Sequence, residues 1–233
     1  SSSSRGLGDV YKRQILTGGE DMLSLHSLDV GILQMKTNYI SIYENALSDD
    51  ECDTIINEFD KNKKHQRKGR SGNGKIQKKT KMSTDITYSI ETDCVTSNIL
   101  SKSLDDHIQK YITDYPDVDY HMNKWSCVPD YNIQRYKPGE GFYKPHCENC
   151  DKLSSYRVLV WMFYLNTVPD GGTLFPTLEI GIKANKGRLV VWPAYWTHIH
   201  MGEISNRYIK YIATGWYGSV SYTHLRAHET TNY

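Results

Sequence analysis

The sequence contains no apolar run of the roughly 18 residues that a membrane-spanning helix requires. Its N-terminus lacks the uninterrupted apolar segment of a signal peptide. Five cysteines is an odd number, and they follow no framework spacing, which argues against a disulfide-stapled secreted domain. The net charge of +1 gives the protein as a whole no general attraction for nucleic acid or for an acidic partner. We therefore expect a cytoplasmic protein with reduced thiols and no membrane partner.

Aromatic residues, by contrast, are plentiful and crowd into the second half of the sequence. There are 18 Tyr and 5 Trp among 233 residues. Such richness favours a β-structured domain over a helical bundle. The length suits one well-buried domain and is barely enough for two.

Neither end of the sequence shows a periodic apolar pattern. The strings DVYKRQ near the start and SYTHLRAHET near the end resemble translated sequencing-adapter reads. We expect residues 1–34 to be a non-native or disordered extension, with the natural start at Met35 rather than Met22. Residues 219–233 are expected to be an artefactual or disordered tail, which leaves 35–218 as the single domain.

The first half of this domain predicts a strand and two helices. The run YISIY at residues 39–43 is β-branched and aromatic, which is typical of a strand. Ser48 and Glu51 form a capping box, and the apolar spacing after it predicts a helix that ends near Lys61. An apolar stripe predicts a second helix from about residue 97 to 113.

Residues 61–81 form a basic stretch with ten Lys and Arg residues and no acidic residue. The stretch offers almost nothing to bury, so we interpret it as a solvated, mobile loop. The alternative is a substrate-facing loop that attracts an acidic or phosphate-bearing partner. No aromatic residue interleaves the charges, so a stacking platform for single-stranded nucleic acid is not supported.

Beyond Pro116, short apolar and aromatic runs alternate with turns rich in Gly and Pro. The runs are NIQRY, RVLVWMFYLN, TLF, RLVVWP and YIKYIATGWY. Many short strands at near-even spacing predict an antiparallel sandwich or barrel. The fold class is therefore α+β, with helices early in the sequence and a double-sheet β core late.

One short motif could bind a metal. In an extended strand, His146 and Glu148 project to the same face, because they are two residues apart. A third ligand, a His from a distant strand, would complete a facial triad of two His and one carboxylate. Such a triad leaves positions open on iron(II) for a cosubstrate and O2.

Two zinc interpretations are weaker. A zinc hydrolase with two His and a Glu usually carries H-E-x-x-H on a helix, and this motif is absent. Cys147 and Cys150 form a C-x-x-C pair, but no second pair of Cys or His is spaced to complete a structural zinc site.

Several blocks around the motif follow one another in a characteristic order. They are YKPGEGFYKPHCE, RVLVWMFYLN, DGGTLF, KGRLVVWP, THIH and RYIKYIATGW. In order and spacing they resemble the prolyl 4-hydroxylase-like branch of the 2-oxoglutarate/iron(II) dioxygenases, over residues 132–217. The resemblance implies a double-stranded β-helix (jelly-roll) core with N-terminal supporting helices. It also implies Fe(II), 2-oxoglutarate and O2 as cofactors, with ascorbate as a reductant.

The resemblance also assigns the metal ligands. His146 corresponds to the first ligand, and Glu148 stands where the family usually has Asp. The distal ligand would be His200, which lies ten residues before a basic residue, as in the family; His198 is the alternative. If Glu148 simply replaces that Asp, an Asp at this position should preserve activity.

Three further residues match the family's cosubstrate site. Lys210, six residues before the final Trp of the blocks, would bind the far carboxylate of 2-oxoglutarate. Tyr164 and Tyr136 correspond to tyrosines that help to hold the cosubstrate. In a protein with 18 Tyr, either could equally be a core residue.

The implied reaction is hydroxylation of a C–H bond in a peptidyl prolyl residue or another side chain, with release of succinate and CO2. The substrate is a peptide or small molecule. One alternative is a β-helix that binds without catalysis, since fold does not fix function. The other is a nucleic-acid dealkylase that uses the basic residues 61–81. It is not favoured, because dealkylases end in R-x5-R, whereas Lys210 is followed here by Trp216.

Overall fold

The computed structural model describes residues 38–71, 76–120, 122 and 124–219. The helices are α3 (Asp49–Lys61), α4 (Val95–Asp114) and α5 (Asp117–Tyr120), with short 3-10 helices at η2 (Lys63–His65), η3 (Pro176–Leu178) and η4 (Trp196–His198). The expected extension at 1–34 lies outside the described residues, as does the expected tail except for its first residue. None of the helices in the described ranges is both long and apolar enough to cross a membrane.

The capping box at the start of α3 is confirmed. The Ser48 hydroxyl accepts the Glu51 N–H at 3.3 Å, and the Glu51 carboxylate accepts the Ser48 N–H at 2.8 Å. The helix ends at Lys61, as the spacing predicts, and buries Cys52, Ile55 and Phe59. The second helix, α4, extends one or two residues beyond each end of the predicted 97–113 range.

The strands form two antiparallel sheets. Their bounds are β1 (Ser41–Tyr43), β2 (Arg67–Lys68), β3 (Thr84–Ser89), β4 (Trp125–Cys127), β5 (Asp130–Tyr136), β6 (Arg157–Tyr164), β7 (Val168–Phe175), β8 (Ile180–Ala184), β9 (Leu189–Pro193), β10 (Met201–Gly202) and β11 (Lys210–Ser219). The large sheet has the order β1-β9-β6-β11-β5-β3-β2, and β4 pairs with β11. The small sheet has the order β10-β7-β8. The predicted double-sheet architecture is confirmed.

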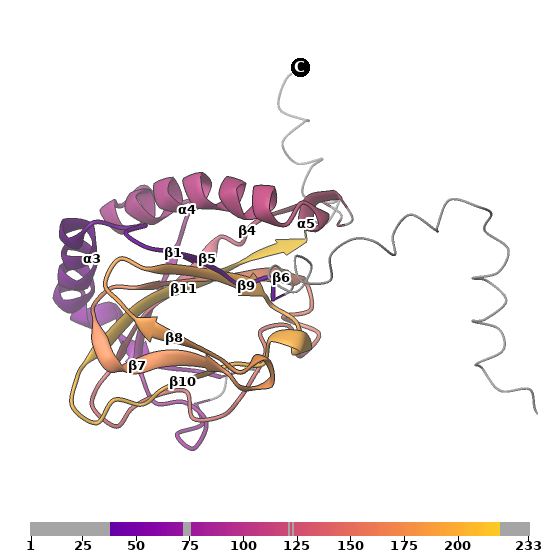
Figure 1. Cartoon of the computed structure of the whole chain (residues 1–233). Coiled ribbons are helices and arrows are strands. Elements are labelled where there is room, and N and C mark those ends of the chain that lie inside the picture. The colour runs from indigo at the N-terminus through magenta and orange to yellow at the C-terminus, as the bar shows by residue number, and fades with distance from the viewer. Residues whose placement is uncertain (1–37, 72–75, 121, 123, 220–233) are drawn as a thin grey trace, which may run out of the picture. The chain divides into compact units, whose positions relative to one another are not determined.

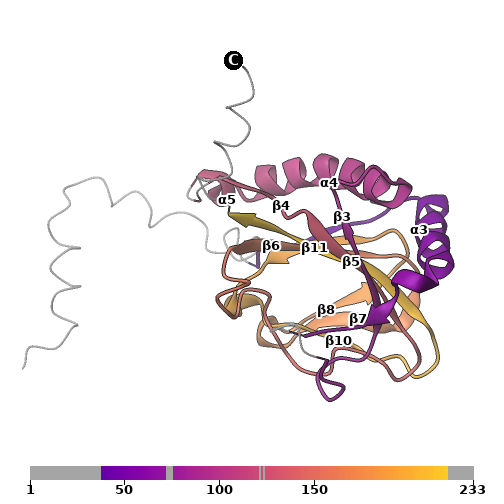
Figure 2. The same ribbon diagram turned by 180° about the vertical axis from the view of Figure 1, so that it is seen from behind.

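The helices lie on one side of the large sheet, and the small sheet lies on the other (Figures 1 and 2). The main apolar core therefore packs between α3, α4 and the large sheet, around Phe59, Leu100 and Trp161. A second apolar cluster, which includes Phe175 and Trp192, fills part of the space between the two sheets. The helices thus support the large sheet from behind and leave its other face for the site.

The basic stretch differs from the predicted solvated loop. It contains η2, and β2 within it pairs with β3. Lys81 is buried and pairs with Asp85 at 2.8 Å. The prediction that this stretch buries almost nothing was therefore wrong at its C-terminal end, where a carboxylate on the neighbouring strand compensates the buried ammonium.

Candidate active site

Two segments that are distant in sequence bring the predicted ligands together. The His146 N–H donates to the His200 carbonyl at 3.0 Å, and the His200 N–H returns a bond to the His146 carbonyl at 2.9 Å. The Glu148 N–H donates to the Ala194 carbonyl at 3.0 Å. The prediction that His146 and Glu148 lie on a regular strand was wrong, because this pairing is an isolated bridge. Pro145 has no N–H to extend a ladder.

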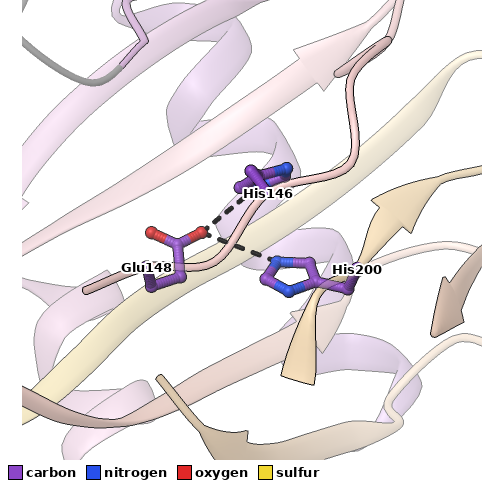
Figure 3. A group of neighbouring side chains, drawn as sticks. All are labelled: His146, Glu148 and His200. Atoms are coloured by element: carbon purple, nitrogen blue, oxygen red, sulfur yellow. Dashed lines mark ion pairs between the residues drawn. The ribbon is translucent and has the colours of Figure 1, made fainter. Parts of the chain in front are cut away.

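The side chains of His146, Glu148 and His200 nevertheless converge. Each offers a ligand atom, and these atoms all lie within 4.8 Å of one another. Figure 3 shows one carboxylate oxygen directed at both imidazoles. Glu148 Oε1 lies 3.4 Å from His146 Nε2 and 3.6 Å from His200 Nε2. Two imidazoles and a carboxylate form the ligand set of a facial iron(II) triad.

The other ring nitrogen of each imidazole faces a backbone carbonyl. His146 Nδ1 lies 3.0 Å from the Lys144 carbonyl, and His200 Nδ1 lies 3.0 Å from the His198 carbonyl. A carbonyl only accepts, so each Nδ1 carries the proton and donates it. The lone pair of each Nε2 is then directed at the common point between the ligands.

The charge of Glu148 suits a ligand. Burial raises the pKa of its carboxyl, but the neighbouring imidazoles of His146 and His200 outweigh this, and the pKa lies well below its usual range. The second carboxylate oxygen, Oε2, accepts hydrogen bonds from Arg157 Nη1 at 3.1 Å and Trp216 Nε1 at 3.2 Å. Neither Arg157 nor Trp216 is predictable from the sequence as a partner of Glu148.

His198, the alternative distal ligand, is not part of this cluster. It ends the 3-10 helix η4, is buried, and its Nδ1 lies 2.9 Å from the Thr197 hydroxyl. His198 and His200 are two residues apart and would share a face only in an extended strand. The 3-10 turn does not meet this condition, because side chains alternate in direction only along extended backbone.

Lys210 begins β11 and is buried. Its Nζ donates to the carbonyls of Gly171 and Glu203, both at 2.9 Å. It makes no ion pair with a carboxylate among the described residues. Burial lowers the pKa of this ammonium to about 8, although the nearby charges of Glu203 and Asp170 oppose the shift. An ammonium has three donors, so one remains for a bound anion.

Tyr136 and Tyr164 line the same cavity as Lys210. Lys210 Nζ lies 5.4 Å from the centroid of the Tyr136 ring. The Tyr164 hydroxyl lies 2.6 Å from the hydroxyl of Thr173, and burial raises the pKa of this tyrosine. Burial also raises the pKa of Tyr136 well above its ordinary value, and its hydroxyl donates to Gln134. Both phenols are therefore neutral donors at physiological pH.

A cavity of about 750 Å³ is lined by the ligand cluster, Lys210 and both tyrosines. Its inner part is lined by Lys210, Tyr164 and Tyr136 as well as the three candidate ligands. Its outer part is lined by residues from the basic stretch and from the segments on either side of the ligands, among them Arg70, Gln77, Lys144 and Leu153. This places part of the basic stretch beside the cavity, as the alternative interpretation of that stretch expects.

Comparison with known proteins agrees with this geometry. Residues 131–218 match the sequence profile of the 2OG-Fe(II) oxygenase superfamily. Probable prolyl 4-hydroxylase 7 of Arabidopsis thaliana is 28% identical over 153 residues, which cover 60% of the present sequence and 42% of that protein. The sequence thus spans less than half of the length of this curated relative.

Two solved structures share the fold. A viral collagen prolyl hydroxylase of Paramecium Bursaria Chlorella virus-1, in a 2OG complex, has a TM-score of 0.61 at 23% identity, covering 79% of the present protein and 98% of the viral one. A prolyl hydroxylase from Trichoplax adhaerens, in complex with a hypoxia inducible factor peptide fragment, has a TM-score of 0.65 at 15% identity, covering 98% of the present protein and 99% of the other. The β core is accordingly the double-stranded β-helix of these proteins. Residues 131–218 thus resemble the 2OG-Fe(II) oxygenase superfamily in sequence, and the described residues share the fold of prolyl hydroxylases.

Proposed function

We propose that this protein is an iron(II)- and 2-oxoglutarate-dependent dioxygenase whose metal ligands are His146, Glu148 and His200. One observation carries the proposal: the convergent ligand set shares a single cavity with the buried ammonium of Lys210, which forms no ion pair within the described ranges. A metal site alone would fit many functions. A metal site beside a buried cation fits a dianionic chelating cosubstrate.

The residues present fit both groups. Two imidazole nitrogens and one carboxylate oxygen lie within 4.8 Å of one another, and together they would hold iron(II) as a two-His, one-carboxylate ligand set that leaves room for a cosubstrate. Lys210 would bind the far carboxylate of 2-oxoglutarate, with the neutral phenols of Tyr164 and Tyr136 nearby. When bound, the metal and cosubstrate supply the oxidation of an unactivated C–H bond, coupled to release of succinate and CO2.

The protein itself contributes position and exclusion of water. The paired backbone bonds between His146 and His200 fix two ligands relative to each other. The carbonyls at their Nδ1 atoms fix the ring tautomers. The buried lysine would hold one end of the cosubstrate and so direct its other end toward the ligands.

The outer cavity favours a peptide with acidic residues near the oxidised side chain, either prolyl or another. Arg70 and Lys144 are exposed and make no ion pair among the described residues. The one acidic side chain at this rim, Asp151, already accepts the N–H groups of Leu153 and Ser154 at 2.9 Å. Acidic peptides should therefore be turned over faster than neutral ones, with the advantage lost at high salt. Equal turnover would contradict this preference, and tight binding of single-stranded DNA would favour a dealkylase.

An anaerobic titration of residues 35–218 with iron(II) and 2-oxoglutarate tests the main proposal. We expect the visible metal-to-ligand charge-transfer band of the chelate. Aerobic addition of peptide, with ascorbate as the reductant, should then yield succinate. Absence of the band would overturn the enzyme proposal and favour a β-helix that only binds.

A further inference from the structure

Each oxygen of the Glu148 carboxylate has its own partners. We propose that Arg157 and Trp216 position this carboxylate for the metal, so that the site requires Glu rather than the usual Asp at position 148. The inference rests on the proposed function, because it concerns the geometry of a metal ligand. This proposal is opposite to the expectation from the family resemblance, in which an Asp at position 148 preserves activity.

The two oxygens face opposite ways. Oε1 faces the imidazole nitrogens of His146 and His200, at 3.4 and 3.6 Å. Oε2 accepts from Arg157 Nη1 at 3.1 Å and from Trp216 Nε1 at 3.2 Å. The carboxylate therefore spans the distance from the ligand cluster to the arginine–tryptophan pair, and its orientation is fixed at both ends.

The backbone of Glu148 cannot easily shift to compensate for a shorter side chain. Its N–H donates to the Ala194 carbonyl at 3.0 Å, and its own carbonyl accepts Arg157 Nη1 at 3.2 Å. Removing one methylene retracts the carboxylate by about 1.5 Å, the length of a carbon–carbon bond. An Asp could then reach the metal or the arginine–tryptophan pair, but not both.

Arg157 is itself held in place before any ligand binds. Its guanidinium lies 3.5 Å from the centroid of the Trp216 ring, which is a cation–π stack. Its carbonyl accepts Asn149 Nδ2 at 3.0 Å, and its N–H donates to the Ser154 carbonyl at 3.0 Å. A donor that is already ordered loses little entropy when it orients a ligand, which makes Arg157 a positioning residue.

The test is anaerobic titration of the protein with iron(II), or with cobalt(II) as a redox-stable probe. Outer partners of metal ligands typically contribute about 10- to 100-fold in affinity, and we expect a loss in that range for Arg157→Gln. Glu148→Asp should lose affinity too, and Arg157→Lys should lose less than Arg157→Gln. Arg135→Gln is the matched control and should bind metal normally. Like Arg157, Arg135 pairs with a carboxylate and lies over an aromatic ring, and the exposed fractions of the two side chains are 20% and 21%. Unlike Arg157, it does not line the cavity.

The double variant sharpens the test. An Asp at position 148 cannot join the metal to the pair, whichever of the two it reaches, so adding Arg157→Gln should weaken metal binding by much less than it does beside Glu. If Arg157→Gln does not fold, Trp216→Phe removes only the indole donor and should still weaken binding severalfold. Unchanged metal affinity in folded Arg157→Gln or in Glu148→Asp would overturn the inference alone. No metal binding by the unaltered protein would overturn the proposed function as well.

Discussion

The two faces of the large sheet are built from the same strands but serve different purposes. On β6, Trp161 and Phe163 belong to the apolar core against the helices, while Met162 and Tyr164 line the cavity. On β11, Tyr211 and Ala213 face that core, while Lys210, Ile212 and Thr214 line the cavity. Side chains alternate along a strand, so neighbouring residues fall into different environments. Stability and chemistry are therefore interleaved in the sequence and separated in space.

The helix face can be dry because helices cover it, whereas the cavity face keeps polar groups that a core would exclude. Lys210 is the clearest case, since a buried ammonium without an anion costs stability. We interpret that cost as the consequence of keeping an anion site ready. Substitutions on the cavity face should change binding, and substitutions on the helix face should change stability.

The largest effect is expected on the cavity face, at the distal ligand. His200→Ala should abolish metal binding and turnover, because only two ligands would remain. His198→Ala should keep both. The outcome is measured as metal content after anaerobic loading and as succinate release. If the His198 variant loses the metal and the His200 variant keeps it, His198 is the distal ligand.

The opposite pattern is expected on the helix face. Trp161 is fully buried, so Trp161→Ala should lower the free energy of unfolding by about 3–5 kcal/mol. His146 is partly exposed and lies on the cavity side of the sheet. His146→Ala should change the free energy of unfolding by less than about 1 kcal/mol while removing metal binding. Urea denaturation measures both variants. Similar destabilisation by both would show that the two faces are not separate in this way.

Lys210→Ala should affect the cosubstrate more than the metal. A charge-assisted bond contributes about 1.5–3 kcal/mol, so the Kd for 2-oxoglutarate should rise roughly 10- to 100-fold. Metal binding without cosubstrate should be unchanged, because Lys210 is not in the ligand cluster. Unchanged cosubstrate affinity by calorimetry would contradict the assignment of Lys210.

The smallest effect concerns pH and the same lysine. Its pKa of about 8 in the folded protein lies below the ordinary 10.5, so the unfolded state holds more protons between these values. The contribution of Lys210 to the free energy of unfolding should therefore rise as the pH increases from about 8 to 10.5. The affinity for 2-oxoglutarate should fall above about pH 8, by up to tenfold per unit, because the neutral amine no longer binds the anion.

Lys210→Arg provides the control for the pH series, since a guanidinium stays charged throughout. If it binds 2-oxoglutarate, its affinity should not change over the same range. If the affinity for 2-oxoglutarate falls equally in the unaltered protein and in Lys210→Arg, a group other than Lys210 causes the pH dependence.

Much of the fold was predictable because its signals are local. The capping box at Ser48 and the apolar spacing after it specify α3, and the Gly- and Pro-bounded runs specify the late strands. Arg157 and Lys81 were not predictable as partners. Their carboxylate partners are only nine and four residues away, but nothing in the local sequence marks a charged residue as buried.

The sequence by itself determined which chemical groups are available: a His and a Glu two residues apart, a distal pair of His, and a lysine ten residues beyond His200. Only the tertiary structure decided how they are used. The 3-10 turn at Trp196–His198 and the backbone bridge to His146 bring His200 into the cluster and leave His198 outside it. The second oxygen of Glu148 is likewise oriented by Arg157, nine residues away, and by Trp216, which is 68 residues away in the sequence. Such long-range contacts depend on how the two sheets close on each other, which no local pattern of residues encodes.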